Sequence, residues 1–470
     1  MIAFGTGGWR AIIGDEFIKS NILLVAQAVA QMIEEDNPLD KRLVIGYDRR
    51  FLSDKAARWI SEVLAGNGIV VQCLTKIAPT PLIMYYAKTY EINYGIAVTA
   101  SHNPAEYNGI KFFTKGGRDA TEEVTQRIEK IIAVLGPEDV LALDYEKAKK
   151  QDLIQEINPF NEYIDTLLKL LDVEAIKKSN LKILVDPMFG VSKNALQALL
   201  ISCRCEVDVI HERHDTTFGG RLPSPSAVTL TRLANMVTEK AYDIGIGTDG
   251  DADRLGIIDE KGHFIHPNDI MALLYYYLLN YKGWSGAVVR NIATTHLLDA
   301  IAEGFGEKCY EVPVGFKHIS SKMEETDAVI GGESSGGLTI RGHIKGKDGI
   351  FAAGLLVEMM CVTGRHLAEM LEEIHQRFGN FKMQEYDRHF SAQRKKELMK
   401  ILFEEKRLPE FGKAIGRISY QDGVKVYFED GSWMIARFSG TEPLIRIFSE
   451  MATIEEARQI GQKMLEFLEV

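Results

Sequence analysis

The feature that most constrains the fold is an alternation of strand-like and helix-like segments that begins three times along the chain. The strand-like segments are short and apolar, and the segments between them, such as 20–35, carry apolar residues at helical spacing. The strand-like segments are 43–48, 69–74 and 94–100 in the first set, 181–186, 206–210 and 243–249 in the second, and 287–292, 309–314 and 328–333 in the third. Because strand–helix–strand units normally form parallel pairs with right-handed crossovers, the chain is predicted to contain three similar α/β domains with mixed sheets.

The last strand of each set runs into a polar loop that contains glycine. These strand ends carry Ser101, Asp249 and Glu333. Ligands of open α/β sheets bind at the carboxyl ends of the strands, so we expect the three loops to face one central cleft.

The pattern changes after about residue 380. Strand-like segments at 416–420, 424–428, 433–439 and 444–450 lead to an amphipathic helix, which is typical of a smaller α+β domain. The predicted domains are 1–158, 159–262, 263–379 and 380–470. A chain of 470 residues is also too long for a single hydrophobic core.

Composition narrows the class of protein. The formal net charge of -11 disfavours a nucleic-acid-binding surface. Five scattered cysteines form neither a disulfide framework nor a metal knuckle, which predicts a reducing cytoplasm. The longest apolar run, 270–279, has about half the length of a membrane span, so no membrane partner is expected. The oligomeric state stays open.

The segment TASHNP (99–104) places Ser101 among small residues at a strand-to-loop junction, where its hydroxyl can meet an incoming group. The same residues favour a tight turn, so a capped turn is the alternative. The G-x-S-x-G pattern of acyl-transfer nucleophiles is missing here. Ser101 is therefore a candidate nucleophile for a different chemistry.

The segment TDGDADR (248–254) alternates Asp249, Asp251 and Asp253 with small residues. In an extended chain these side chains share one face, and their carboxylates repel one another unless a cation lies between them. Oxygen ligands of this kind favour Mg²⁺ or Ca²⁺. An EF-hand is excluded because Arg254 stands where that loop needs glycine. A solvated acidic turn is the remaining alternative.

Three further segments carry groups suited to a sugar phosphate. GGESSGG (331–337) offers a carboxylate and hydroxyls for a sugar, although a plain glycine-rich turn fits it equally, and RGHIKGKDG (341–349) adds titratable groups beside it. RFSGTEP (437–443) combines a guanidinium, hydroxyls and backbone N–H groups in a compact phosphate cradle, with a solvated hairpin turn as the alternative. The opening FGTGGWR (4–10) places Arg10 after a loop that can approach an anion, and it is not a Walker loop.

Together these segments resemble those of the α-D-phosphohexomutase (phosphoglucomutase/phosphomannomutase) family, in the family's order and spacing along the whole chain. The resemblance implies a heart-shaped, four-domain enzyme with a mobile fourth domain. Such an enzyme moves a phosphoryl group reversibly between the 1- and 6-positions of a hexose, through a phosphoserine and a bisphosphate intermediate. Ser101 would carry the phosphate and bind Mg²⁺ together with Asp249, Asp251 and Asp253, and glucose 1,6-bisphosphate would be the activator. The other residues that the resemblance implies are Lys111, Arg254, His102 and Arg10 for catalysis, Glu333, Ser335, Lys317, His343 and Lys347 for the sugar, and Arg437, Ser439, Gly440 and Thr441 for the phosphate.

The proton carrier and the substrate stay open. In many relatives a histidine stands where this chain has Gly337, which leaves Lys111, His102, His343 and Lys347 as candidate acids and bases. The loop GESSGG followed by RGHIKGKDG favours glucose 1-phosphate and glucose 6-phosphate as the small-molecule partners. Phosphomannomutase and then phosphoglucosamine mutase are the alternatives within the family, and a phosphatase or sugar-bisphosphate synthase is the alternative of another class.

Overall fold

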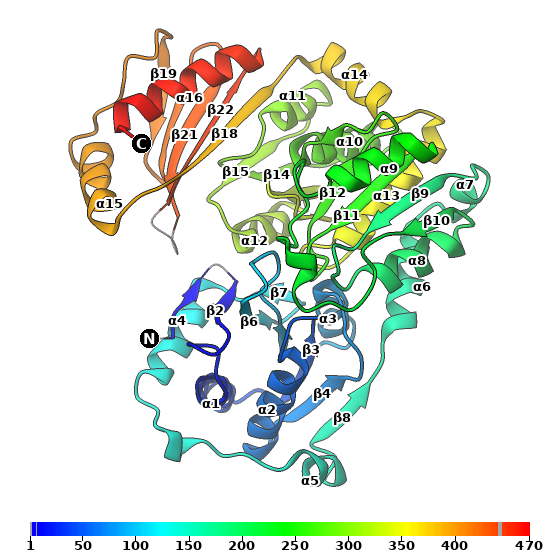
Figure 1. Cartoon of the computed structure of the whole chain (residues 1–470), viewed down its shortest axis with the longest axis vertical. Coiled ribbons are helices and arrows are strands. Elements are labelled where there is room, and N and C mark those ends of the chain that lie inside the picture. Colours follow the sequence, from blue (N-terminus) through cyan, green and yellow to red (C-terminus); the bar gives the residue numbers. More distant parts are fainter. Residues whose placement is uncertain (1, 6, 440–443) are drawn as a thin grey trace. The chain divides into compact units, whose positions relative to one another are not determined.

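The computed structural model describes residues 2–5, 7–439 and 444–470, apart from the side chain of Ala392 (Figure 1). By its internal contacts the chain divides into two compact units. The first comprises Met1–Ile270 and Ser335–Ala368, and the second comprises Met271–Ser334 and Glu369–Val470.

The first unit begins with a mixed sheet whose strand order is β1-β2-β6-β5-β3-β4-β8, with β7 paired to β6. Its strands are β1 (Phe4–Gly5), β2 (Gly8–Ile12), β3 (Arg42–Tyr47), β4 (Val70–Leu74), β5 (Tyr94–Val98), β6 (Tyr107–Thr114), β7 (Arg118–Asp119) and β8 (Ile154–Ile157). Its helices are α1 (Lys19–Asp36), α2 (Ser53–Gly66), α3 (Thr80–Thr89), α4 (Glu122–Ile132) and α5 (Tyr145–Lys150), and a 3₁₀ turn covers Pro137–Asp139. The central strands β3, β4 and β5 are parallel and buried along almost their whole length, because helices cover the sheet.

A second sheet in the same unit has the order β10-β9-β11-β12-β13. Its strands are β9 (Lys182–Asp186), β10 (Glu206–Val209), β11 (Ile244–Thr248), β12 (Leu255–Ile258) and β13 (Phe264–Ile265). The associated helices are α6 (Phe160–Leu170), α7 (Val173–Lys177), α8 (Lys193–Ser202), α9 (Thr231–Lys240) and α13 (Gly349–Thr363), together with a short helix at Phe218–Gly220. Strand β17 (Leu338–Ile340) precedes α13. Helix α10 (Pro267–Asn280) begins in the first unit and continues into the second. The strands β10, β9 and β11 are parallel, whereas β11 and β12 form an antiparallel hairpin.

The second unit contains a third α/β arrangement, in which parallel β14 pairs with β15 and β16. Its elements are β14 (Val288–Asn291), α11 (Leu297–Gly304), β15 (Cys309–Val312), α12 (Phe316–Thr326), β16 (Ile330–Gly332) and α14 (Leu367–Phe378).

The C-terminal part of this unit is an antiparallel sheet with the order β18-β22-β21-β20-β19. Its elements are β18 (Lys382–His389), α15 (Ala392–Met399), a π-helical turn at Lys400–Glu404, β19 (Ile415–Ser419), β20 (Val424–Phe428), β21 (Trp433–Phe438), β22 (Leu444–Met451) and α16 (Ile454–Leu468). Helix α16 lies across the sheet (Figure 1) and buries Ile460 and Met464 against its apolar face. One core therefore unites the sheet and the helix, as expected for an α+β domain.

The predicted fold class, three mixed-sheet α/β domains and a smaller α+β domain, is confirmed. The arrangement around a central cleft and the four domain boundaries stay predictions. Strands β1 and β2 pair antiparallel within FGTGGWR and place Arg10 on β2. One local expectation was wrong. The residues 249–253 are not extended, but form the tight turn of the β11–β12 hairpin, where Ala252 has a positive φ of 63°.

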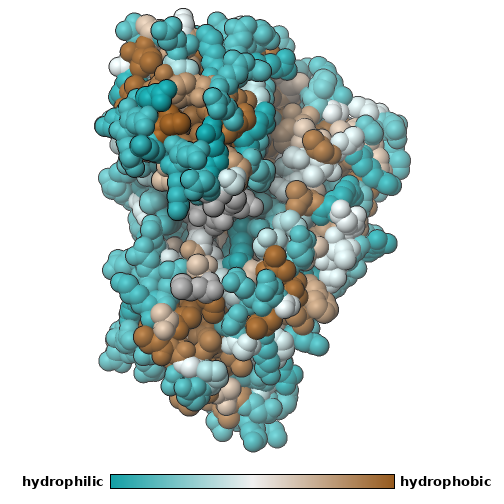
Figure 2. Space-filling view, turned by 60° about the vertical axis from the view of Figure 1, so that its left-hand side comes forward, coloured by the Kyte–Doolittle hydropathy of each residue, from teal (hydrophilic) through white to brown (hydrophobic). Residues whose placement is uncertain are grey.

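Most large apolar side chains lie in the cores, and hydrophobic side chains form small separate groups among hydrophilic ones on the face shown in Figure 2. Among the described helices none is by itself long and apolar enough to cross a membrane, and one pair, α13 and α14, passes the length and composition test only together, across a bend of 82°.

Candidate active site

Ser101 lies in the loop between β5 and β6 with a left-handed backbone, φ 52°, which is uncommon for a residue other than glycine. Its N–H donates to Thr99 Oγ1 over 2.8 Å, and Thr99 Oγ1 in turn donates to Asp48 Oδ2 over 2.6 Å. Its own hydroxyl donates to Asp249 Oδ2 over 2.8 Å. The predicted nucleophile and the first predicted metal ligand are therefore in direct contact.

The buried guanidinium of Arg50 supports this loop from within. Its two terminal nitrogens donate to four backbone carbonyls of the loop and the start of β6: Ser101 (2.7 Å), Asn103 (2.6 Å), Pro104 (2.7 Å) and Tyr107 (2.9 Å). Four bonds from one cation hold the unusual backbone of Ser101 in place. Arg50 was not predicted from the sequence, although the charged Asp-Arg-Arg run directly after strand β3 was a signal for it.

Asp249, Asp251 and Asp253 are buried, and one oxygen from each lies within 4.8 Å of the others. The predicted convergence is present, but the hairpin turn brings the carboxylates together rather than an extended strand. Asp251 Oδ1 and Asp253 Oδ1 are buried without a hydrogen-bond partner among the described residues. Buried carboxylate oxygens without donors fit a divalent cation that prefers oxygen ligands, so this donor set suits Mg²⁺.

Two lysines reach the same carboxylates. Lys111 Nζ lies 2.6 Å from Asp251 Oδ2 and 2.7 Å from Asp253 Oδ2, and Lys347 Nζ lies 3.0 Å from Asp253 Oδ2. Burial and the two neighbouring carboxylates raise the pKa of Asp249 well above its usual range. Burial has the same tendency at Asp253, but the charges of Lys111 and Lys347 outweigh it and hold its pKa well below that range. The lysines therefore offset much of the negative charge of the cluster.

The two candidate proton carriers nearest Ser101 differ in charge. Burial alone would lower the pKa of Lys111, but Asp251 and Asp253 raise it above its ordinary value, so this lysine is a cation. The positive charge of Arg254, with burial, lowers the pKa of His102 well below its ordinary value, so this imidazole is neutral. His102 Nδ1 lies 3.4 Å from Ser101 Oγ.

Two arginines complete the positive surroundings of the serine loop. Arg10, on β2, donates to Asn103 Oδ1 over 2.6 Å, and its pKa is lowered by burial and by the charge of Arg254. Arg254 follows the carboxylate turn, where its N–H donates to Asp249 Oδ1 over 3.0 Å and its Nε lies 3.9 Å from Asp253 Oδ1.

His343 and Lys347 have different surroundings, although both were candidate sugar ligands and proton carriers. The buried ring of His343 contacts Asp348 Oδ2 through Nε2 at 2.6 Å and packs against Phe351. Lys347 instead reaches the carboxylates across Gly337, where an added Cβ would lie 2.2 Å from Lys347 Cδ. The absence of a side chain at Gly337 therefore makes room for Lys347. Ser335, in the same loop, is exposed.

Glu333 follows β16 in the second unit, and one of its oxygens is fixed. Oε1 accepts bonds from the Gly315 N–H and from Asn291 Nδ2, each over 3.1 Å. The described residues provide no donor for its other oxygen, Oε2, which leaves an acceptor for a hydroxyl group. Lys317 is half-buried in the first turn of α12, two residues after Gly315. Asn291 was not predicted from the sequence, although it ends the buried strand β14 and Asp249 and Glu333 directly follow buried strands.

Arg437 and Ser439 lie at the end of β21, and Ser439 N–H donates to Leu444 O over 2.8 Å to close the hairpin with β22. Arg437 Nε donates to Asp422 Oδ1 over 2.8 Å, and no described residue accepts a bond from its terminal nitrogens. Lys395 Nζ donates to Ser439 O over 2.9 Å. Gly440 and Thr441, which were also predicted to bind phosphate, lie outside the described residues.

Family models match all four parts of the chain. The phosphoglucomutase/phosphomannomutase alpha/beta/alpha domains I, II and III match residues 1–136, 161–262 and 266–378, and the C-terminal domain of the same family matches residues 381–467. The chain belongs to the phosphoglucomutase/phosphomannomutase family. This α-D-phosphohexomutase has a relative in Thermococcus kodakarensis, named a phosphoglucomutase/phosphomannomutase, that is 32% identical over 98% of both chains.

Other relatives of this phosphohexomutase carry names for different sugars. A protein from Methanopyrus kandleri, provisionally named a phosphoglucosamine mutase, is 29% identical over 99% of this chain and 97% of its own length. A solved structure from Thermus thermophilus, provisionally named a phosphomannomutase, superposes with a TM-score of 0.87 at 29% identity, over 100% of this chain and 99% of its own. The family is therefore established, and the names of the relatives span glucose, mannose and glucosamine phosphates.

Proposed function

We propose that this phosphohexomutase interconverts the 1- and 6-phosphates of a hexose, with glucose phosphate as the favoured substrate, through a phosphoserine at Ser101. One observation supports the proposal most strongly: the Ser101 hydroxyl donates to a carboxylate of a buried cluster of three that is suited to a divalent cation. A merely structural serine would not require such a concentration of buried charge beside it.

In the proposed reaction, Ser101 Oγ carries a phosphoryl group that it gives to the free hydroxyl of a hexose monophosphate. The bond between Oγ and phosphorus breaks as a new bond to the sugar oxygen forms, which gives a hexose bisphosphate. The serine hydroxyl then takes the other phosphoryl group from this intermediate. The phosphoserine is regenerated in each cycle, and added glucose 1,6-bisphosphate acts as an activator because it phosphorylates free Ser101.

Charge neutralisation is the main contribution that a protein makes to such transfers. Asp249, Asp251 and Asp253 would hold Mg²⁺ together with the seryl phosphate, and the bound ion supplies a positive charge to the phosphoryl oxygens. Arg10 and Arg254 contribute fixed positive charge beside the serine loop.

The sugar hydroxyl must lose a proton as it is phosphorylated, and the geometry favours His102 over Lys111 as the acceptor. His102 is neutral and its Nδ1 lies 3.4 Å from Ser101 Oγ, whereas Lys111 is protonated and engaged with two carboxylates. Lys347 remains a second candidate because it reaches the same carboxylates. The Nε2 of His343 is engaged with Asp348, so this ring would have to leave its buried position to serve.

Most of the groups proposed to recognise the rest of the substrate belong to the second unit, and Ser335 belongs to the first. Glu333 presents Oε2 to hydroxyls 3 and 4 of the sugar, together with Ser335 and Lys317, and Arg437 presents its terminal nitrogens to the phosphate that is not transferred, together with Ser439, Gly440 and Thr441. A planar guanidinium with two outward N–H groups suits the two oxygens of a phosphate.

The preference for glucose phosphate is tested by initial rates with glucose, mannose and glucosamine 1-phosphates, each with Mg²⁺ and a trace of the matching bisphosphate. We expect the largest kcat/KM for glucose 1-phosphate. Glucosamine 1-phosphate is the second candidate, because the Methanopyrus kandleri relative is named for it; a clearly larger kcat/KM for this compound would overturn the preference.

The same assay separates a mutase from a phosphatase or a sugar-bisphosphate synthase. A mutase converts glucose 1-phosphate without releasing inorganic phosphate, whereas net phosphate release or accumulation of bisphosphate would indicate the other classes. The cytoplasmic location remains a proposal, argued from the scattered cysteines of the sequence.

A further inference from the structure

Asp422, in the turn between β19 and β20, joins two segments of the second unit. Its Oδ1 accepts a bond from Arg437 Nε over 2.8 Å, and its Oδ2 accepts a bond from the Val314 N–H over 2.7 Å. Asp422 and Arg437 each expose 21% of the side chain, so solvent screens this ion pair less than it screens a surface pair.

The segment that Asp422 contacts also holds the predicted sugar ligand. The N–H of Val314 donates to Asp422, and the next N–H, that of Gly315, donates to Glu333 Oε1 over 3.1 Å. Gly315 has φ 126°, a conformation that residues with a side chain rarely adopt, so this pair of donors depends on glycine. Two successive peptide groups therefore orient the carboxylates of Asp422 and Glu333.

The loop at 314–315 packs against a buried apolar cluster. Val314 packs against a buried apolar cluster of Ile292, Ala293, Trp433 and Ile435, which joins the segment after β14 to strand β21. Close-packed clusters of this kind transmit displacement rather than absorb it. A shift of the loop at 314–315 would therefore change the position of Asp422 as well.

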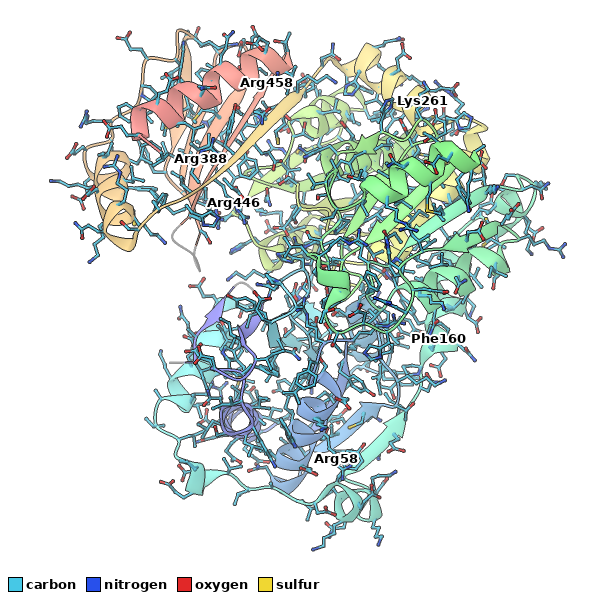
Figure 3. All side chains as sticks on the ribbon, in the orientation of Figure 1. Arg58, Phe160, Lys261, Arg388, Arg446 and Arg458 are labelled. Atoms are coloured by element: carbon cyan, nitrogen blue, oxygen red, sulfur yellow. The ribbon has the colours of Figure 1, made fainter. Side chains whose placement is uncertain are left out.

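Arg437 and its neighbour Arg446 differ in the carboxylate that each contacts. In the β21–β22 pair Arg437 stands directly opposite Arg446, and like charges in such positions repel. Arg446, labelled in Figure 3, has its own carboxylate: its Nε lies 3.5 Å from Asp387 Oδ1 in an exposed pair. The Asp422 carboxylate also binds the loop that holds Glu333, through the Val314 N–H.

We propose that Asp422 is a positioning residue that orients Arg437 and ties the phosphate-binding arginine to the loop that holds Glu333, so that recognition of phosphate and recognition of sugar are coupled. This inference rests on the proposed function. With Nε fixed by Asp422, the two terminal nitrogens of Arg437 face outward as a pre-oriented pair, which lowers the cost of ordering the side chain when phosphate binds.

Binding is measured without turnover in the Ser101→Ala protein, by calorimetric titration with glucose 6-phosphate. We expect Asp422→Asn to weaken binding about tenfold or more, since the Arg437 guanidinium loses its charged hydrogen-bond partner. Arg437→Met weakens binding at least as much. In the Arg437→Met background, Asp422→Asn should change Kd by less than about twofold, because the residue that it orients has already been removed.

The control is Asp387→Asn, which removes one negative charge from the partner of the neighbouring arginine. We expect it to change Kd by less than about twofold, and equal effects of the two Asp→Asn changes would overturn the proposal. Effects of Asp422→Asn and Arg437→Met that simply multiply would overturn it too, since a merely structural Asp422 acts in both backgrounds. Thermal melts of each variant identify those that fail to fold, and for these Asp422→Glu replaces Asp422→Asn.

The proposed function fails in a different way. Wild-type protein that converts none of the three hexose 1-phosphates would refute the mutase, while non-additive binding of glucose 6-phosphate would still support the role of Asp422. A Ser101→Ala protein that binds no glucose 6-phosphate would overturn the role of Asp422, while turnover by the wild-type protein would still support the mutase.

Discussion

Replacing Arg50 by lysine tests whether the serine loop is held by one guanidinium. The two terminal nitrogens of Arg50 serve two pairs of carbonyls, Asn103 with Ser101 and Pro104 with Tyr107, at 2.6–2.9 Å. A lysine has a single nitrogen, which can take the place of only one of the two, so about two carbonyls lose their donor.

The magnitude follows from these contacts. Each carbonyl left without a partner costs about 1–3 kcal/mol, which gives about 2–6 kcal/mol if Ser101 and Asn103 lose their donor. If Pro104 and Tyr107 lose it, the cost is about 1–3 kcal/mol, because Pro104 O also accepts the Tyr107 N–H over 3.1 Å. The left-handed backbone of Ser101 itself costs about 1–3 kcal/mol and persists only because its surroundings enforce it. Without Arg50, the serine loop can therefore relax to a backbone conformation in which Ser101 is not positioned for phosphoryl transfer. If relaxation accounts for about 2 kcal/mol, the competent fraction, and kcat with it, falls about 30-fold.

The assay measures kcat and KM for glucose 1-phosphate, together with the melting temperature. Arg49→Lys is the matched control, because Arg49 is also buried but donates to the carbonyls of Phe189, Glu212 and Arg213 instead. We expect both variants to lose stability and only Arg50→Lys to lose kcat. An Arg50→Lys enzyme whose kcat stays within about twofold of the wild-type value would show that the serine loop does not depend on this guanidinium.

Three further predictions concern the metal, the sugar loop and pH. Chelation of divalent cations should abolish turnover, and Mg²⁺ should restore it; full activity after dialysis against a chelator would contradict the role of the carboxylate cluster. Gly337→Ala should displace the side chain of Lys347, from which its Cβ would lie only 2.2 Å, and lower kcat as Lys347→Met does; wild-type rates in the alanine variant would show that Lys347 can move without consequence. Burial and the charge of Arg290 lower the pKa of His296 from 6.5 to about 4. Between pH 6.5 and about pH 4 the imidazole of His296 is therefore protonated in the unfolded chain and neutral in the folded chain. The free energy of unfolding should fall as pH falls through this window, by at most about 3 kcal/mol. Denaturant titrations of His296→Gln should show a smaller fall, whereas the exposed His263→Gln should behave as wild type.

The residues that could be predicted from the sequence are those that lie close together in the chain. Ser101 follows a buried strand, and Asp249, Asp251 and Asp253 fall within one short segment, so local chemistry pointed to both. Even there the geometry differed, since a hairpin turn and a positive φ at Ala252 bring the carboxylates together.

The residues that were not predicted form hydrogen bonds with backbone groups, which the sequence does not identify. Arg50 donates to backbone carbonyls some fifty positions away, and Asp422 accepts from a backbone N–H more than a hundred positions away. Almost every residue supplies such backbone groups, so no pattern of side chains predicts which of them will be bonded. Strand β18 was missed for a related reason: only its position beside β22 makes it a strand, since its mostly exposed residues show no apolar alternation.

Ser101 is proposed to carry the phosphoryl group between the two positions of the sugar. The enzyme is incubated with glucose 1,6-bisphosphate and Mg²⁺, and the mass of the peptide that contains Ser101 is then measured. We predict one added phosphate on Ser101, its loss on addition of excess glucose 1-phosphate, and neither phosphate nor turnover in Ser101→Ala. A Ser101→Ala protein that retains mutase activity, or an active enzyme that carries its phosphate on another residue, would contradict the account.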